Sequence, residues 1–249
     1  MFQNLKTDGL EQAKDTLGGG FVKESGIYLA TLKQMIGGAS DSGALNVTLL
    51  ATLPDGSEYR ETIYVSNRQG LPYYERDGKK IPLPGFTTID DICMMTVGAP
   101  LSEVRWEEKT IKMYNRDAGA EVPTSANCIE GVSGEKVYLG IQKVLANKAK
   151  KNDLTGKYED TAEERQYNAI DKVFHAESKQ TMAEARNGQD ATFFDAWDKK
   201  RSGQVKDERT IKDGVAASGA TAGRPKPATP PAAGAAPAAT ATKPMFGKR

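Results

Sequence analysis

Turn-forming residues divide the stretch from residue 26 to residue 68 into three short segments in which polar and apolar side chains alternate. "GIYLATLKQMI" ends at "ASDSG", and "PDG" at residues 54–56 separates the second segment, "ALNVTLLATL", from the third. Alternation with a period of two is typical of β-strands, and short turns of this kind favour antiparallel neighbours. The sequence therefore predicts an antiparallel meander of three strands.

Two later segments alternate in the same way. "VRWEEKTIKMYN" covers residues 104–115 and stops at "RDAG". "EKVYLGIQKVLANK", residues 135–148, places Val137, Leu139 and Ile141 on one face. Both segments are predicted to be strands.

A helix is predicted between the third and fourth strands, at residues 87–98. Thr88 and Asp91 have the spacing of a capping box, and Gly98 is a typical stop. Five antiparallel strands with a helix after the third are typical of an OB-fold. We therefore expect a mainly β chain, an OB-fold-like antiparallel five-stranded barrel with one or two added helices. A small β-sandwich or an SH3-like barrel fits the same pattern.

The segment after the fifth strand is less regular. Residues 161–178, "TAEERQYNAIDKVFHAES", have helical spacing of apolar side chains but also fit a strand. Residues 190–203, "DATFFDAWDKKRSG", predict an amphipathic helix with Thr192 as N-cap and with Phe193 and Trp197 four residues apart.

The C-terminal region has the composition of a disordered tail. From Gly214 onward, 28 of 36 residues are Ala, Gly, Pro, Ser or Thr, and six are prolines. We predict a folded domain at residues 1–202, with a helical C-terminal extension, and a disordered, basic tail at residues 203–249. The tail holds eight of the basic residues while the whole chain has a formal net charge of only +1, so a polyanion site on the domain must be a local patch.

The sequence carries no sign of export or membrane insertion. No run of about 18 apolar residues is present, and the N-terminus lacks the features of a secretory signal. We expect a soluble cytoplasmic protein with no membrane partner. Its two cysteines, Cys93 and Cys128, are expected to be buried free thiols.

Residue types needed for catalysis are scarce. His175 is the only histidine, so a histidine-based metal cluster or a Ser-His-Asp triad would have to rest on that single residue. "LGGGF" at residues 17–21 lacks the Lys and Ser/Thr of a Walker loop. Adjacent acidic pairs such as Asp90 and Asp91 are better explained as solvated surface than as metal ligands. We therefore expect no enzyme activity, no catalytic residue, no metal and no cofactor.

Aromatic and cationic residues gather in the third segment and beyond it. Arg60, Thr62 and Tyr64 share one strand face, which continues to Ser66 and Arg68, while Ile63 and Val65 point to the core. Proteins that hold unpaired nucleic acid combine aromatic rings for bases with cations for phosphates. Tyrosine, threonine and arginine are also ordinary on solvent-facing strands, so the pattern alone leaves that simpler explanation open.

A loop with two tyrosines after Pro72 and a lysine cluster at residues 143–151 supply further candidates. The predicted single-strand-binding residues share an aromatic ring, a hydroxyl or a positive charge, and they are Arg60, Thr62, Tyr64, Arg68, Tyr73, Tyr74, Lys79, Lys80, Lys148, Lys150 and Lys151. If they lie along one groove, a strand's phosphates can follow it.

Several longer strings are similar to a known family. "MFQNLKTDGLEQ", "LGGGF", "EYRETIYVSNRQG", "KKIPLPGFTTIDDIC", "EEKTIKMYNRDAGAEVPTS" and "IDKVFHAES" resemble the single-stranded DNA-binding proteins of lytic podovirus-type bacteriophages, over about residues 1–187. The resemblance implies an OB-type core that coats DNA without cutting it during phage replication and recombination, in the host bacterial cytoplasm. It assigns no individual binding residue.

The tail departs from the pattern common among single-strand binders, whose tails end in acidic residues around an aromatic tip. Phe246 keeps the aromatic tip, but no acidic residue follows Asp213. One hypothesis is a single-stranded DNA-binding protein; a second is an adaptor that recruits replication, recombination or host transcription proteins through this tail. A metal-dependent nuclease is disfavoured because ligands are scarce.

Overall fold

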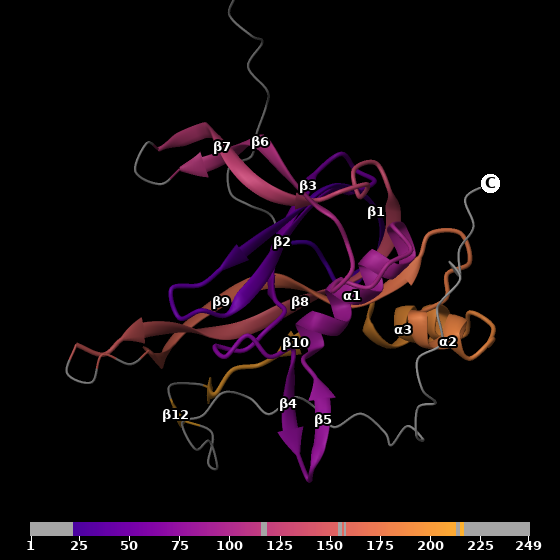
Figure 1. The fold of residues 1–249 in the computed structure, drawn as a ribbon. Coiled ribbons are helices and arrows are strands. Elements are labelled where there is room, and N and C mark those ends of the chain that lie inside the picture. The colour runs from indigo at the N-terminus through magenta and orange to yellow at the C-terminus, as the bar shows by residue number, and fades with distance from the viewer. Residues whose placement is uncertain (1–21, 116–118, 154–155, 157, 213–214, 217–249) are drawn as a thin grey trace, which may run out of the picture.

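The computed structural model describes residues 22–115, 119–153, 156, 158–212 and 215–216, and these form a mainly β structure (Figure 1). One large sheet contains eight strands: β1 (Gly26–Ala39), β2 (Leu45–Thr52), β3 (Glu58–Tyr64), β6 (Trp106–Asn115), β7 (Ala120–Ile129), β8 (Lys136–Lys151), β9 (Tyr158–His175) and β10 (Val205–Asp207). Two small two-stranded sheets are formed by β4 (Tyr73–Arg76) with β5 (Lys79–Pro82) and by β11 (Ile211–Lys212) with β12 (Val215–Ala216).

Strand β1 is the centre of the large sheet. Along one edge it pairs antiparallel with β2, and β2 pairs in turn with β3, which confirms the predicted meander. Its N-terminal half pairs with β8 on the other edge, and further along Ile36 pairs with Cys128 of β7. The sheet therefore branches at β1 into two hairpins, β6–β7 and β8–β9, which extend beyond the meander in Figure 1.

Three helices accompany the sheet: α1 (Pro84–Thr96), α2 (Met182–Arg186) and α3 (Phe193–Arg201). Helix α1 contacts β3, β8 and β9, and its buried side chains, Ile89, Ile92 and Cys93, join those of the sheet in one core. Val137, Leu139 and Ile141 enter the same core, as their alternation predicts. Both cysteines are buried free thiols, which confirms that expectation.

The sheet is not closed into a barrel. Within the described residues no backbone ladder joins β3 to β9, so the mainly β class is confirmed but the five-stranded OB-like barrel is not. Helix α1 explains the opening, because a Cβ on Gly85 would lie only 2.2 Å from the carbonyl oxygen of Tyr64. The first turn of α1 thus occupies the edge of β3 that a closing strand would need.

Two helix starts differ from the prediction. Helix α1 begins at Pro84 with Leu83 as N-cap, and no side chain caps it, so the capping box of Thr88 and Asp91 is wrong. Proline is well suited to the first helical position because its φ is already fixed there. Thr192 is the N-cap residue of α3 as predicted, but its side chain does not cap the helix.

The segment that fits either a helix or a strand from its sequence is a strand. Residues 161–178 lie mostly in β9, so the strand alternative was the right one.

The predicted tail boundary at residue 203 is too early, because β10 pairs in parallel with β8 and Asn147 accepts hydrogen bonds from the backbone N–H groups of Thr210 and Ile211. Residues 217–249, which include the aromatic tip at Phe246, lie outside the described residues, as does "LGGGF".

Candidate nucleic-acid interface

Strand β3 has the two faces that its sequence predicts. Tyr59 and Ile63 are buried and point to the core, whereas Arg60, Thr62 and Tyr64 are exposed on the opposite face. The Tyr64 side chain is 48% exposed, which is high for a tyrosine within a sheet. A ring held on a rigid strand and open to solvent is available for stacking.

The strand register shows which residues of β2 and β1 lie on the same face of the sheet as Tyr64. Cross-strand neighbours share a face, and the register places Thr62 opposite Thr48, Thr48 opposite Ile36, and Ile36 opposite Cys128. The hydroxyls of Thr48 and Thr62 are hydrogen-bonded at 2.9 Å. We call this surface the outer face, and its residues on the meander are Gln34, Ile36, Gly38, Asn46, Thr48, Leu50, Arg60, Thr62 and Tyr64.

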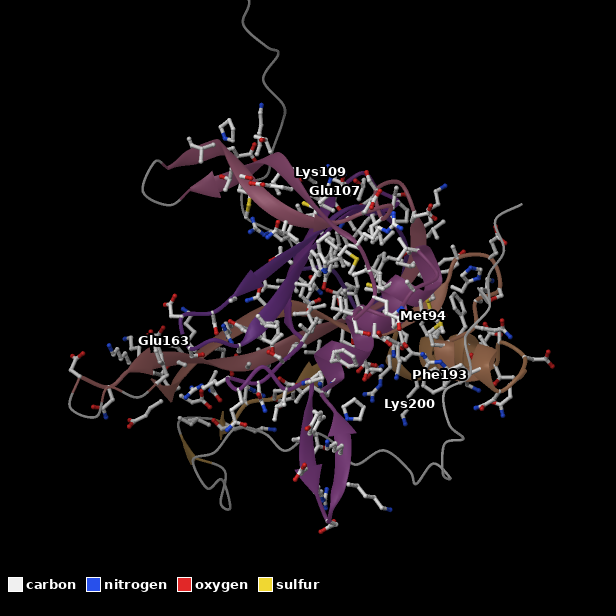
Figure 2. All side chains as sticks on the ribbon, in the orientation of Figure 1. Met94, Glu107, Lys109, Glu163, Phe193 and Lys200 are labelled. Atoms are coloured by element: carbon white, nitrogen blue, oxygen red, sulfur yellow. The ribbon has the colours of Figure 1, made fainter. Side chains whose placement is uncertain are left out.

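The outer face continues onto the β6–β7 hairpin. The strand β6 is predicted from the sequence, but this continuation of the face is not. Cys128 lies opposite Glu107 of β6, and Lys109 is two residues further on the same face. Lys109 and Glu107 form an ion pair at 2.5 Å and lie side by side in Figure 2. Only the branching of β1 brings these residues to Tyr64's side of the sheet, so no local sequence signal could have identified them.

The alternation of β3 ends at Val65. Ser66, predicted on the outer face, is buried instead, because its hydroxyl accepts a hydrogen bond from the backbone N–H of Leu45. Arg68 follows in an exposed loop and makes no ion pair within the described residues. Its carbonyl lies 3.3 Å from the Cβ position of Gly43, so the loop lies beside the β1–β2 turn.

Tyr73 and Tyr74 belong to a hairpin and not to the predicted loop. Asp77 and Gly78 form its turn with φ values of 52° and 70°, the left-handed pair that a two-residue type I′ turn requires. An Asp-Gly pair between alternating residues is a strong hairpin signal, so the sequence contained the information. The hairpin projects away from the large sheet (Figure 1).

The two faces of the β4–β5 hairpin differ in charge. One face carries Tyr73, and the Nζ atom of Lys80 lies 4.7 Å from the centre of its ring. The register places Tyr74 and Lys79 on the other face together with Arg76, and both tyrosines are half-buried. The second face therefore combines a ring with two cations.

The three predicted lysines of β8 lie on the β8–β9 hairpin. Lys148 and Lys150 share the carboxylate of Glu163, at 3.2 and 3.7 Å. Hydrogen bonding to Lys148 lowers the pKa of Glu163. Lys151 pairs across the ladder with Tyr158, whose side chain is 73% exposed. Tyr158 is not among the predicted binding residues, because the segment for which a strand was one alternative, residues 161–178, begins after it.

Ten of the eleven predicted residues thus lie on three surfaces, and Arg68 lies in the loop after β3. Arg60, Thr62 and Tyr64 are together on the outer face, the two tyrosines and two lysines after Pro72 are on the β4–β5 hairpin, and the three remaining lysines are on the β8–β9 hairpin. The two hairpins point in different directions in Figure 1. The single groove that would unite all of the predicted residues is not a feature of this arrangement.

The open seam between β3 and β9 contains a partly buried carboxylate. Glu61 accepts hydrogen bonds from the hydroxyl of Tyr59 at 2.7 Å and from the backbone N–H of Ile170 at 2.9 Å. Burial raises the pKa of Glu61, although both hydrogen bonds oppose the shift. Beside it lies a pocket of about 380 Å³, whose lining includes Thr62, Tyr64, Thr88, Asp171 and Lys206.

In the part of the chain that the structure describes, no group of three or more His, Cys, Asp or Glu side chains is arranged to hold a metal ion. None of the helices described is both long enough and apolar enough to span a membrane.

Comparison with known proteins adds no assignment: neither the protein-family models nor the curated protein sequences contain a match to this chain.

Proposed function

We propose that this chain binds single-stranded DNA without strong sequence preference and has no catalytic role. The observation that carries the proposal is the half-exposed ring of Tyr64 on the outer face of the sheet, with Arg60 on the same strand face. An aromatic ring stacks on any base and contributes about 1 to 3 kcal/mol per base. The guanidinium of Arg60 is available for a phosphate because it makes no ion pair within the described residues.

The rest of the outer face suits a sequence-tolerant ligand. Gln34 and Asn46 offer amides at the two ends of the face, whereas Thr48, between them, is buried and its hydroxyl is bonded to that of Thr62. The acidic residues at its margins are engaged, since Glu58 pairs with Lys33 and Glu107 with Lys109. Among the described residues, these two carboxylates at the margins are therefore each neutralised by a lysine.

We further propose that the two projecting hairpins extend the contact. Tyr158 is the most exposed of the large apolar or aromatic side chains described, and it lies opposite Lys151, which makes no ion pair among the described residues. Tyr74 and Lys79 repeat the combination on the β4–β5 hairpin. The sequence resemblance to phage single-strand binders supports a role in DNA replication and recombination.

Charge reversal on the outer face and in the loop that follows β3 tests the proposal. The affinity of a labelled oligo(dT) is measured by fluorescence anisotropy at several salt concentrations for the wild type and for the double variant Arg60→Glu/Arg68→Glu. We expect weaker binding to every oligonucleotide sequence and a salt slope that is shallower by about 0.7 for each phosphate that the variant no longer binds. Lys199→Glu, an exposed cation on α3, is the matched control. Equal affinity for the double variant and the control would remove the outer face from the proposal.

A further inference from the structure

The pocket at the open seam adjoins the outer face. Thr62 and Tyr64 belong to both, and the opposite walls come from the first turns of α1, from β9 and from Lys206 of β10. Its volume of about 380 Å³ lies within the range of about 300 to 1,000 Å³ that is usual for small organic ligands. A planar group of a ligand bound on the outer face could therefore turn into this pocket beside Tyr64.

The charges around the pocket determine what it can accept. Glu61 and Asp171 contribute carboxylates, and the only cation in its lining, Lys206, is paired with Glu208 at 2.7 Å. A phosphate group would be repelled by the two carboxylates, because like charges at close range oppose each other. A neutral heterocycle with N–H donors would instead find acceptors there. The lining therefore favours a base over a phosphate.

The walls are held in place before any ligand arrives. The carboxylate of Glu61 is fixed by Tyr59 and by the backbone of Ile170. Asp171 accepts a hydrogen bond at 2.7 Å from the indole N–H of Trp197, which is buried. Thr88 is fixed by a hydrogen bond at 3.0 Å to the carbonyl of Pro84. A preformed pocket does not have to be ordered on binding, so less of the interaction free energy is lost.

We propose that this pocket receives one unpaired base of the bound strand, turned out from the bases that lie on the outer face. The inference rests on the proposed function and deepens it, because it says how the site distinguishes single strands from duplex. A base in a duplex is stacked and paired, and turning it out costs a few kcal/mol. A base in a single strand is already unpaired, so only single strands fill the pocket at little cost.

Substitution of Thr88 tests the pocket without touching the outer face. Thr88→Phe fills the space from a rigid helix, Thr88→Val keeps the volume of the original side chain, and Thr87→Phe places the same ring on the neighbouring exposed position of α1, outside the pocket. Each variant is titrated with oligo(dT) and with an oligonucleotide of the same length that carries abasic sites. Thermal unfolding of each variant shows whether it is folded at the temperature of the assay.

The expected result is a loss of oligo(dT) affinity of at least fivefold for Thr88→Phe, with Thr88→Val and Thr87→Phe close to the wild type. The abasic strand should bind all four proteins alike. Equal oligo(dT) affinity for Thr88→Phe and Thr87→Phe overturns the pocket but leaves the proposed function in place. Failure of the wild type to bind any single strand overturns the proposed function itself. If Thr88→Phe does not fold, Thr88→Leu provides a smaller obstruction, and wild-type affinity for Thr88→Leu overturns the inference.

Discussion

The carboxylate of Glu61 on β3 accepts a hydrogen bond at 2.9 Å from the backbone N–H of Ile170 on β9, across the seam where these two strands fail to pair. The Glu61 side chain thus accepts a backbone N–H of β9 that a backbone carbonyl would accept if the two strands were paired. The same oxygen also accepts the hydroxyl of Tyr59, so one carboxylate satisfies two donors between the strands.

Removal of this carboxylate should destabilise the fold. In Glu61→Ala the Ile170 N–H and the Tyr59 hydroxyl lose their acceptor, and each unsatisfied buried group costs about 1 to 3 kcal/mol. Glu61→Gln retains an acceptor oxygen and should cost less. Urea unfolding of the three proteins gives the free energies of unfolding. Equal stability of Glu61→Ala and the wild type would mean that the hydrogen bonds at the seam contribute nothing.

Asp91 should make the protein less stable above about pH 6. Burial raises the pKa of Asp91 to about 6, the neighbouring Asp90 adds to the shift, and Arg186 and Lys172 oppose it. The pKa of a carboxyl in an unfolded chain is about 4. The folded protein therefore binds the proton more tightly, and stability falls as the pH rises from about 4 to above 6. Asp91→Asn should flatten this dependence and be more stable than the wild type at pH 8. An unchanged or steeper pH dependence in the variant contradicts the assignment.

Glu184 should have the opposite effect at acidic pH. One of its oxygens accepts the N–H of Thr181 at the start of α2, and the other accepts the N–H groups of Thr192 and Phe193 at the start of α3. Burial alone would raise the pKa of Glu184, but these hydrogen bonds lower it overall. Its contribution is therefore present above the unfolded pKa of about 4.3 and is lost as the pH falls through the folded value.

Replacement of Glu184 tests whether its carboxylate stabilises the starts of both α2 and α3. Glu184→Ala should cost about 1 to 2 kcal/mol, because α3 loses the carboxylate that caps it, whereas α2 loses one half of its capping box and keeps the Thr181 cap. The loss should be largest at pH 7 and should shrink below pH 4, as followed by circular dichroism during urea unfolding. A loss that is independent of pH would show that packing, and not the carboxylate charge, is responsible.

Glu163 should weaken DNA binding by the β8–β9 hairpin. Its carboxylate lies between Lys148 and Lys150 and occupies both ammonium groups. Glu163→Gln frees them for phosphates, so we expect tighter binding of oligo(dT) at low salt and a steeper salt dependence. Glu121→Gln on β7, another exposed carboxylate, serves as the control. Affinity gains of equal size in both variants would point to net charge alone.

The local parts of this structure follow from the sequence, and the long-range parts do not. Period-two alternation located β1, β2 and β3, and it correctly assigned Ile63 and Val65 to the inside of the sheet. It gave no hint of β7, whose Pro123 argues against a strand although the ladder with β6 runs through it. The choice between helix and strand for β9 depended on β8, its partner in the ladder.

The candidate site shows the same division. The exposure of Arg60, Thr62 and Tyr64 was predictable because it depends only on their own strand. The extension of the outer face to Lys109, the exposure of Tyr158 and the pocket beside Tyr64 depend on how β1 branches and on where α1 lies. These relationships join residues far apart in the chain, so no local pattern encodes them.

The central claim is that Tyr64 stacks on a base of a bound single strand, and the affinity of Tyr64→Ala for oligo(dT) tests it most directly. Leu45→Ala is the matched control, because Leu45 is also 48% exposed but lies on the opposite face of the meander. We predict a loss of about 1 to 3 kcal/mol for Tyr64→Ala, which is roughly 5- to 150-fold in Kd, with little change for Leu45→Ala. Equal affinities for the two variants and the wild type would contradict the account.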